Sequence, residues 1–394
     1  MSKKKICLVT NWYPTKDNPY QGLFFREQAI ALSEYYDFVV LHYKYSWDKR
    51  KEIADLRLDK KEYNITEYTA NICYSSRNRR LYRLKKSNID YEESVFNKCC
   101  KQLSEVENID LFYSICGQND GAEIAKYVAY FRKPYVVSEH GPFPWVNSLI
   151  NDKTRKAIEN ADLFMAISND KVRQILMQNV KLPKIWYVGN MVDESKFVYK
   201  LSNNEIKTFV TVGANVFYKN YGLLIDTFNK LKEITDIPFK VIILGYQANK
   251  GYSQDSKQLE EALYNSQFAQ NIEMIPNVPH DEMVDVFARA DAFVMTSIQE
   301  GQPVSAIEAG CCGLPIFSTR CGGVEDYVDD NIGRIVGLLD SDKLAQYLKD
   351  YLEGNITFNP ELIRDAVVSK FGKEQFVRNM VDGFESILQV RLKQ

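Results

Sequence analysis

Residues 292–310 have the sequence AFVMTSIQEGQPVSAIEAG, in which a short apolar run is followed by a polar segment and then by an apolar helical pattern. The run is typical of a buried strand, and the pattern after Pro303 is typical of a helix. Gly301 permits a tight turn, and Pro303 suits a first helical turn because its missing N–H would be unbonded there anyway. The free amides of Val304 and Ser305 then point out of the carboxyl edge of a parallel sheet, where a helix N-terminus favours a diphosphate.

Two carboxylates flank this helix entry. Glu308 lies about one and a half turns into the helix, where it can accept hydrogen bonds from a ribose diol, and Glu300 can accept them from a sugar ring. A glutamate near a helix start is ordinarily a dipole partner or a cap, which is the favoured interpretation for Glu308 taken alone. Glycines also open the next sheet edge, at Gly313-Leu314-Pro315 and Cys321-Gly322-Gly323. Together these features predict a ligand cleft.

The rest of the chain repeats a β-branched or aromatic run followed by a segment of period 3.6, the pattern of parallel βα units. In the first half, strands are predicted at 5–10, 37–43, 110–115, 134–138, 161–167 and 185–188. Helices are predicted between them at 23–33, 91–106, 120–131, 146–160 and 169–178.

The second half repeats the pattern. Strands are predicted at 208–212, 240–244, 271–275, 292–295, 314–318 and 333–336. Helices are predicted to start near residues 220, 254, 281, 304, 324 and 341, and two more, at 359–368 and 373–392, close the chain. The fold class is therefore α/β with two doubly wound parallel sheets, although residues 44–90 fit this pattern poorly.

The chain of 394 residues is long enough for two domains. Residues 192–204 are the predicted linker, with an N-terminal domain at 1–198 and a C-terminal domain at 199–372. The 8 cysteines show no C-x-x-C step, which favours reduced thiols in a cytoplasmic protein. No apolar run approaches the ~18 residues of a membrane span, so any membrane contact is expected to be peripheral.

The net charge of −2 conceals an asymmetry, because residues 1–200 carry a charge of +7 and residues 201–394 a charge of −9. A domain that binds nucleic acid usually has a pI above ~9, and the first half of this chain lacks such a pI. Its positive charge therefore suits an anionic surface or a lipid-phosphate acceptor better than nucleic acid. Six basic residues lie between Arg77 and Lys86 with no acidic residue among them. A solvated surface is the more ordinary interpretation of such a run, and membrane contact is the alternative.

The chain resembles the retaining GT-B glycosyltransferases of family 4, also described as glycosyl transferases group 1, through its E-x7-E element at Glu300 and Glu308. The resemblance extends across most of the chain. It includes Gly213 with Lys219 and, in the first half, the segments that contain Gly22 and His140, with Asn190-Met191-Val192-Asp193 before the linker.

The resemblance implies two Rossmann-like domains facing across a cleft, the terminal helix crossing back to the first, and a nucleotide-sugar donor held mainly by the second. Glu308 would bind the ribose, Glu300 the hydroxyls of the donor sugar, and Lys219 would neutralise the diphosphate leaving group. The implied catalytic residues are Glu300, Lys219 and His140, the last in contact with the transferred sugar. The implied donor-binding residues are Gly22, Gly213, Asn215, Lys219, Glu300, Gly301, Gln302, Pro303, Val304, Ser305 and Glu308.

This sequence departs from the family at two positions. The arginine that usually follows the glycine of the phosphate strand is Ala214, so one cation is missing, and the sequence leaves open whether Arg320 or an acceptor-side residue replaces it. The glycine that commonly follows the lysine is Asn220, which is itself a good helix cap.

The expected function is retaining transfer of a hexose-type sugar from a nucleoside diphosphate sugar, a UDP-sugar, to an acceptor hydroxyl in cell-surface or capsular polysaccharide biosynthesis. The acceptor is a glycan or lipid-linked glycan. The resemblance and the lack of a ligand cluster imply no metal and no cofactor beyond the co-substrate. The alternatives are a nucleotide-sugar epimerase of the same fold and a non-catalytic sugar-binding protein. A nicotinamide-dependent oxidoreductase is discounted, because no G-x-G-x-x-G follows the first strand.

Overall fold

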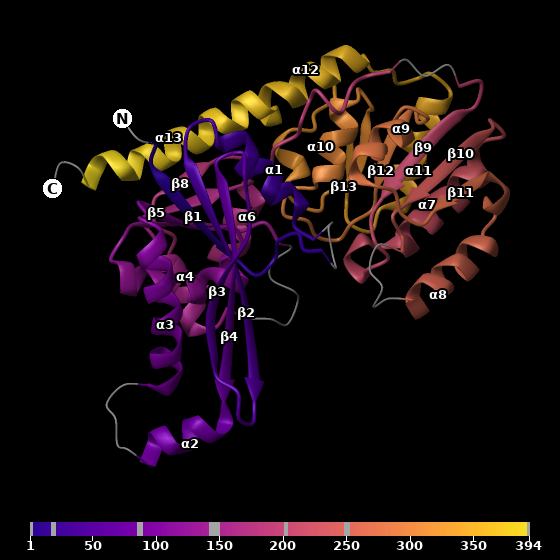
Figure 1. Cartoon of the computed structure of the whole chain (residues 1–394). Helices are drawn as coiled ribbons and strands as arrows, with labels where there is room; N and C mark the ends of the chain where they lie inside the picture. The colour runs from indigo at the N-terminus through magenta and orange to yellow at the C-terminus, as the bar shows by residue number, and fades with distance from the viewer. Residues whose placement is uncertain are drawn as a thin grey trace. The chain divides into compact units, whose positions relative to one another are not determined.

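The computed structural model describes residues 3–16, 21–84, 90–141, 150–200, 204–247 and 253–391. The chain forms two compact units, which Figure 1 shows with their elements labelled. Unit 1 comprises Met1–Ile167, Val172–Val188 and Val377–Gln394, and unit 2 comprises Ser168–Lys171 and Gly189–Phe376. The domain ranges 1–198 and 199–372 stay a prediction. The two units are defined by their contacts, which do not test whether either part folds alone.

Unit 1 is built on an eight-stranded sheet with the order β3-β4-β2-β1-β5-β6-β7-β8. Its strands are β1 (Lys5–Thr10), β2 (Asp37–Asp48), β3 (Ile53–Glu62), β4 (Ile65–Ser75), β5 (Leu111–Ser114), β6 (Tyr135–Ser138), β7 (Leu163–Ala166) and β8 (Ile185–Tyr187). The pairings are parallel except that β3 is antiparallel to β4. The helices are α1 (Leu23–Leu32), α2 (Ser76–Leu84), α3 (Tyr91–Val106), α4 (Gly117–Phe131), α5 (Asp152–Glu159) and α6 (Asn169–Leu176), with most of α13 (Lys373–Arg391).

Side chains that alternate along the strands bury both faces of this sheet, as expected of a doubly wound fold. On one face, Cys7 and Phe112 lie in a core with Phe96 of α3 and Tyr127 of α4. On the other face, Phe384 of α13 is fully buried, and its ring lies 5.5 Å from that of Tyr113 of β5. The last helix of the chain is therefore part of the packing of the first unit.

Unit 2 contains a six-stranded parallel sheet with the order β11-β10-β9-β12-β13-β14. Its strands are β9 (Lys207–Val212), β10 (Phe239–Leu244), β11 (Ile272–Ile275), β12 (Ala292–Met295), β13 (Ile316–Thr319) and β14 (Gly333–Val336). Its helices are α7 (Tyr221–Ile234), α8 (Ser253–Tyr264), α9 (Met283–Phe287), α10 (Val304–Cys311), α11 (Ser341–Leu352) and α12 (Pro360–Phe371). Short 3₁₀ turns include η1 (Phe217–Lys219), η4 (His280–Glu282) and η5 (Val324–Asp326).

Each face of this sheet has its own core. Phe209 of β9 packs with Phe228 of α7 and Leu344 of α11, whereas the next residue, Val210, packs on the other side with Ile307 of α10. This alternation fixes the direction in which the strand ends point and so positions the loops that follow them. Among the described helices, none is long and apolar enough to cross a bilayer.

The predicted elements agree with the structure to within a few residues, with three exceptions. Residues 44–90, which did not fit the pattern, contain the end of β2, all of β3 and β4, and helix α2. The helix predicted near residue 324 is wrong, because only the 3₁₀ turn η5 forms there. The helix predicted at 146–160 begins at Asp152, and its first part lies outside the described residues.

Candidate functional site

The carboxyl ends of β9, β12 and β13 lie next to one another at one edge of the sheet of unit 2, because these strands are parallel neighbours. The loop after β9 begins at Gly213, the loop after β12 contains Glu300, and the loop after β13 contains Gly322 and Gly323. An open α/β sheet binds ligands at this edge. The residues of unit 2 that are predicted to hold the donor therefore come together at one edge of its sheet, whereas Gly22, predicted to bind the donor as well, lies in unit 1.

An ion pair between Lys219 and Glu300 lies at the centre of this edge. Lys219 Nζ is 2.8 Å from Glu300 Oε1, and both side chains are largely buried. Ser297 Oγ donates a second hydrogen bond to the same oxygen at 2.8 Å. Gly213, with φ of 156°, leaves room for the lysine stem, since a Cβ there would lie 2.9 Å from Lys219 Cε. Two hydrogen bonds to one carboxylate oxygen thus hold the pair, and the lysine stem passes close to Gly213.

The charge of Lys219 is secured by its neighbour. Burial alone would lower the pKa of Lys219, but the Glu300 carboxylate outweighs that effect and raises the pKa above its usual value. The backbone around the pair is fixed as well, because Thr296 Oγ1 donates to the carbonyl oxygens of Lys219 and Asn220 at 3.2 and 3.1 Å. The site therefore holds a permanent cation in a largely buried position.

The start of α10 presents unbonded amides. The helical hydrogen bonds begin with Ala306 and Ile307, whose amides both donate to the Pro303 carbonyl at 3.2 Å, so the amides of Val304 and Ser305 have no acceptor within the helix. Pro303 is the residue before the helix and not, as predicted, part of its first turn. Val304 and Ser305 are partly exposed, and the binding of an anion by their amides stays a prediction.

The loop that leads into α10 is tightly held. Ser168 Oγ donates to the carbonyl oxygen of Gly301 at 2.7 Å, and Asn190 Nδ2 donates to that of Gln302 at 2.8 Å. Gly323, with φ of 70°, lies against the same loop, because a Cβ there would lie 2.4 Å from the oxygen of Gly301. The predicted donor-binding residues Gly301 and Gln302 are thus fixed in position by backbone contacts.

Glu308 is buried in α10 and contacts a histidine that the sequence interpretation missed. His280 Nε2, in η4, lies 2.6 Å from Glu308 Oε1, and the histidine ring is 5.5 Å from that of Phe197. The two residues are separated by 28 positions in the chain, so only the fold brings them together. Such a contact orients the carboxylate predicted to bind the ribose.

Ala214 stands where the resembled family usually has an arginine, so this position supplies no positive charge. Ala214 is followed by Asn215, whose amide donates to the carbonyl oxygen of Tyr246 at 3.1 Å. Arg320 lies on the neighbouring loop, near Glu325. Burial raises the pKa of the Glu325 carboxyl, and the charge of Arg320 acts in the opposite direction. Whether Arg320 serves the diphosphate stays an open prediction.

In unit 1, Gly22 and His140 lie close to the same side chain. Gly22, with φ of 64°, precedes α1, and its α-carbon packs toward the Trp12 backbone and Phe25. The ring of Phe25 lies 5.1 Å from that of His140 in an edge-to-face arrangement. Gly22, predicted to bind the donor, and His140, predicted to contact the transferred sugar, therefore share one end of the sheet of unit 1, after β1 and β6.

Asp120, at the start of α4, was not predicted as a feature of that end of unit 1. It is fully buried, Tyr43 donates to its Oδ1 at 2.7 Å, and the Asn11 amide donates to the same oxygen at 3.2 Å. Burial raises the pKa of Asp120 to about 7, against hydrogen bonds that lower it. Within the described part of the chain, no group of three or more His, Cys, Asp and Glu residues is placed to hold a metal ion.

Comparison with known proteins shows similarity to glycosyltransferases. Residues 192–366 match the family described as Glycosyl transferases group 1. The chain is 23% identical over 215 residues to a phosphatidylinositol N-acetylglucosaminyltransferase component of Arabidopsis thaliana, an alignment that covers 54% of this chain and 46% of that protein. It is 24% identical over 309 residues to the N-acetyl-alpha-D-glucosaminyl L-malate synthase of Bacillus anthracis, covering 70% of this chain and 74% of that protein. The chain thus spans less than half the length of the Arabidopsis relative.

Among solved structures, Anabaena Alr3699/HepE in complex with UDP-glucose is similar to this chain with a TM-score of 0.71 at 15% identity, over 97% of this chain and 99% of that one. An identity this low establishes the fold alone. The two α/β units with parallel sheets are accordingly those of a GT-B fold, and the predicted fold class is confirmed.

Proposed function

We propose a function from the premise that residues 192–366 form a glycosyl transferases group 1 domain within a GT-B glycosyltransferase. This chain transfers a hexose-type sugar from a UDP-sugar to an acceptor hydroxyl, with retention of configuration. The observation that carries the proposal is the buried pair of Lys219 and Glu300 in the same unit as the free amides of Val304 and Ser305. A cation and a helix N-terminus are the two groups that stabilise a departing diphosphate without a metal.

Each group has a role that follows from its position. Lys219, kept protonated by Glu300, meets the charge that develops on the diphosphate as the sugar leaves. The α10 amides bind the phosphate oxygens, Glu300 binds sugar hydroxyls, and Glu308, oriented by His280, binds the ribose diol. The donor is thereby held mainly by unit 2, and the acceptor is left to unit 1.

In the reaction, the bond between the anomeric carbon and the diphosphate oxygen breaks, and a bond to the acceptor oxygen forms on the same face of the sugar. The acceptor proton passes to the departing phosphate oxygen, so no separate base is required. The family favours retention, and no described residue of the site stands out as a covalent nucleophile. We further propose that the activity needs no divalent metal and serves the assembly of a cell-surface polysaccharide on a lipid-linked glycan.

The UDP-glucose bound by the Anabaena structure supports a nucleotide sugar as donor, and the name of the Bacillus relative supports a sugar as the transferred group. Base and sugar are best determined with a panel of radiolabelled UDP-, GDP- and ADP-sugars, each incubated with the full chain and scored for nucleotide release. We expect slow release from one UDP-sugar even without an acceptor. Conversion of the donor to its epimer would identify an epimerase instead, and tight binding of a donor without turnover would identify a sugar-binding protein.

A further inference from the structure

A surface of mixed basic and apolar character lies at the far end of the long strands of unit 1. The last residues of β2 are exposed, the turn Lys49–Lys51 connects β2 to β3, and α2 follows the end of β4 (Figure 1). The amide of Arg77 donates to the carbonyl oxygen of Lys49 at 3.2 Å, so this turn and α2 lie side by side. We call the surface formed by Trp47, Lys49–Lys51 and α2 the basic tip.

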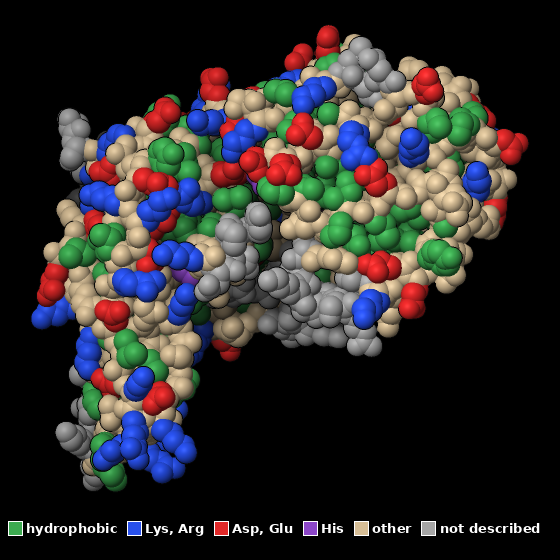
Figure 2. Space-filling view, turned by 45° about the vertical axis from the view of Figure 1, so that its right-hand side comes forward, with side chains coloured by type: hydrophobic (Ala, Val, Ile, Leu, Met, Phe, Trp, Pro, Cys, Tyr) green, Lys and Arg blue, Asp and Glu red, His purple; other side chains and the backbone are tan. Residues whose placement is uncertain are grey.

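The basic tip joins charges from two separate parts of the sequence. Its exposed cations are Lys49, Arg50, Lys51, Arg77, Arg79, Arg80 and Arg83. Among the described residues, the side chains of Arg77, Arg80 and Arg83 make no ion pair, whereas Arg79 lies 3.3 Å from Glu92 and over the ring of Trp47. Figure 2 shows blue side chains gathered at the lower end of the molecule, with green ones beside them.

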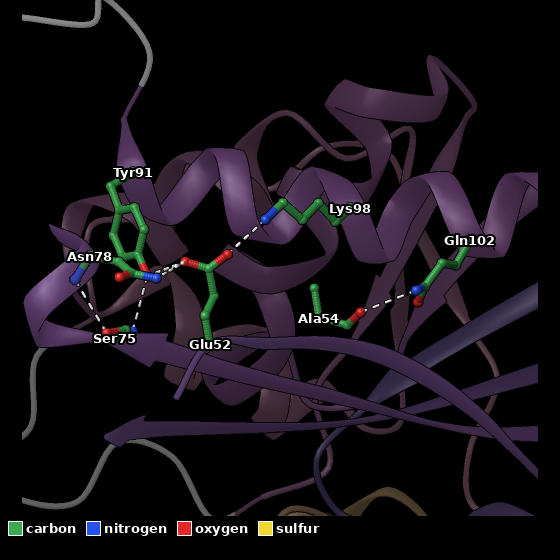
Figure 3. Close-up of polar contacts among 7 residues, drawn as sticks. All are labelled: Glu52, Ala54, Ser75, Asn78, Tyr91, Lys98 and Gln102. Atoms are coloured by element: carbon green, nitrogen blue, oxygen red, sulfur yellow. Dashed lines mark hydrogen bonds and ion pairs between the residues drawn. The ribbon is translucent and has the colours of Figure 1, made fainter. Parts of the chain in front are cut away.

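A polar network holds α2 in a fixed orientation (Figure 3). Asn78 Nδ2 donates to Glu52 Oε2 at 3.0 Å, and the Tyr91 hydroxyl donates to the same oxygen at 2.7 Å. Lys98 Nζ donates to the other carboxylate oxygen at 2.6 Å. Tyr82, one turn after Asn78, packs its ring 5.6 Å from that of Tyr91. One side of α2 is therefore fastened to β3 and α3.

The stripe of α2 next to this fastened side faces solvent although it carries large apolar side chains. Leu81 is 49% exposed and Leu84 is 78% exposed, and α2 contains no buried residue. Helical spacing places Arg77, Leu81 and Leu84 on one stripe, with Arg80 and Arg83 beside it. Trp47, at the end of β2, is 49% exposed. Leucines framed by arginines, with a tryptophan nearby, are the composition of a helix that lies in a bilayer interface.

We propose that the basic tip docks this protein on a bilayer that contains anionic lipids. The arginines bind the headgroup phosphates, and Leu81 and Leu84 enter the boundary between headgroups and acyl chains. A soluble polyanion such as nucleic acid would match the charges but would leave the two leucines uncovered, so charge and apolar exposure together favour the bilayer. The docking itself does not depend on the proposed function. The further idea that docking brings the enzyme to a lipid-linked acceptor does rest on the proposed function.

The test is flotation of the full chain with vesicles of phosphatidylcholine alone or mixed with phosphatidylglycerol, without any nucleotide sugar. We expect binding only to the anionic vesicles and release by high salt. Changing Arg77, Arg79, Arg80 and Arg83 to Gln should weaken partitioning by about 100-fold or more. The matched control changes four exposed lysines away from the tip, Lys61, Lys101, Lys181 and Lys240, to Gln and should retain most of the binding.

A second variant separates the bilayer from other polyanions. Leu81→Ser with Leu84→Ser keeps every charge and should weaken vesicle binding about tenfold or more, without changing retention on a heparin column. Equal binding to neutral and anionic vesicles, equal loss in the lysine control, or full vesicle binding by the leucine variant would overturn the proposal. Because α2 buries no residue and the four control lysines are exposed, all variants should unfold at the wild-type temperature. Donor turnover, measured in solution without vesicles, fails or succeeds independently of these results.

Discussion

At the scale of single residues, the two glutamates of the E-x7-E element have different surroundings and should have separable roles. Glu300 contacts Lys219 and Ser297, whereas Glu308 contacts His280. We expect Glu308→Ala to weaken binding of free UDP by the ~1.5–3 kcal/mol of a charged hydrogen bond, measured by calorimetry. Glu300→Gln should leave UDP affinity nearly unchanged and slow turnover. Equal losses of affinity in the two variants would contradict this division.

His280 provides a second test at this scale, because it contacts the carboxylate and not the expected ligand. His280→Ala should lower UDP affinity about three- to tenfold, since Glu308 then loses the partner that orients it. His280→Gln keeps a side-chain donor and should recover part of the affinity, which a purely structural loss would not allow. Unchanged affinity in His280→Ala would show that the ribose site is formed without the histidine.

Some residues of the site could be predicted from a short stretch of sequence, and others could not. Lys219, Glu300 and the start of α10 were predictable, because glycines, a proline and an apolar strand mark them within short stretches of sequence. The contact between His280 and Glu308 and the buried Asp120 were not, since each depends on segments far apart in the chain. The sequence carries no local pattern that indicates such contacts.

At the scale of elements, β3, β4 and α2 escaped the sequence interpretation for a physical reason. In β3, no residue is fully buried and most are exposed, so the alternation of apolar and polar residues at 54–59 is too short to identify the strand. Helix α2 buries nothing and is held by polar contacts of Asn78. The βα units of both sheets were predicted well because most of their apolar residues enter a core.

Glu52 allows the anchoring of α2 to be measured. Burial alone would raise the pKa of Glu52, but hydrogen bonds from Lys98, Asn78 and Tyr91 outweigh it and lower the pKa to about 2. Since the folded pKa lies below the unfolded value of about 4.3, the stabilisation is complete above that value and is lost as pH falls toward 2. Amide exchange of residues 76–84, corrected for the intrinsic rate, should therefore be constant above pH ~5 and accelerate below pH ~4.

Glu52→Ala should accelerate the same exchange about tenfold at neutral pH, because hydrogen bonds to a charged group are lost. Glu105→Ala is the matched control, since Glu105 makes only an exposed pair with Lys101 at 3.8 Å. Protection of α2 that is identical in the two variants would mean that the Glu52 network does not fasten the helix.

At the scale of the whole molecule, the end of the chain stabilises its beginning. Phe384 of α13 is fully buried against the rings of Tyr36 and Tyr113, and Trp186 Nε1 donates to the carbonyl oxygen of Asn379 at 2.8 Å. Phe384→Ala should destabilise unit 1 by about 3–5 kcal/mol in urea unfolding. Leu362→Ala, at a position on α12 that is 59% exposed, should change stability little. A small effect at Phe384 would show that α13 is dispensable for unit 1.

We propose that unit 2 activates a UDP-sugar through Lys219 and that the sugar is transferred with retention of configuration. The most direct measurement is a proton NMR time course of the active donor, in the presence of a chelator, that follows the anomeric configuration of the sugar first released to water. We predict release of the sugar with the donor's own configuration, together with UDP, and a rate about 10²–10³-fold lower in Lys219→Ala. Release of the opposite anomer, complete loss of activity in chelator that magnesium restores, or an unimpaired Lys219→Ala would contradict the account.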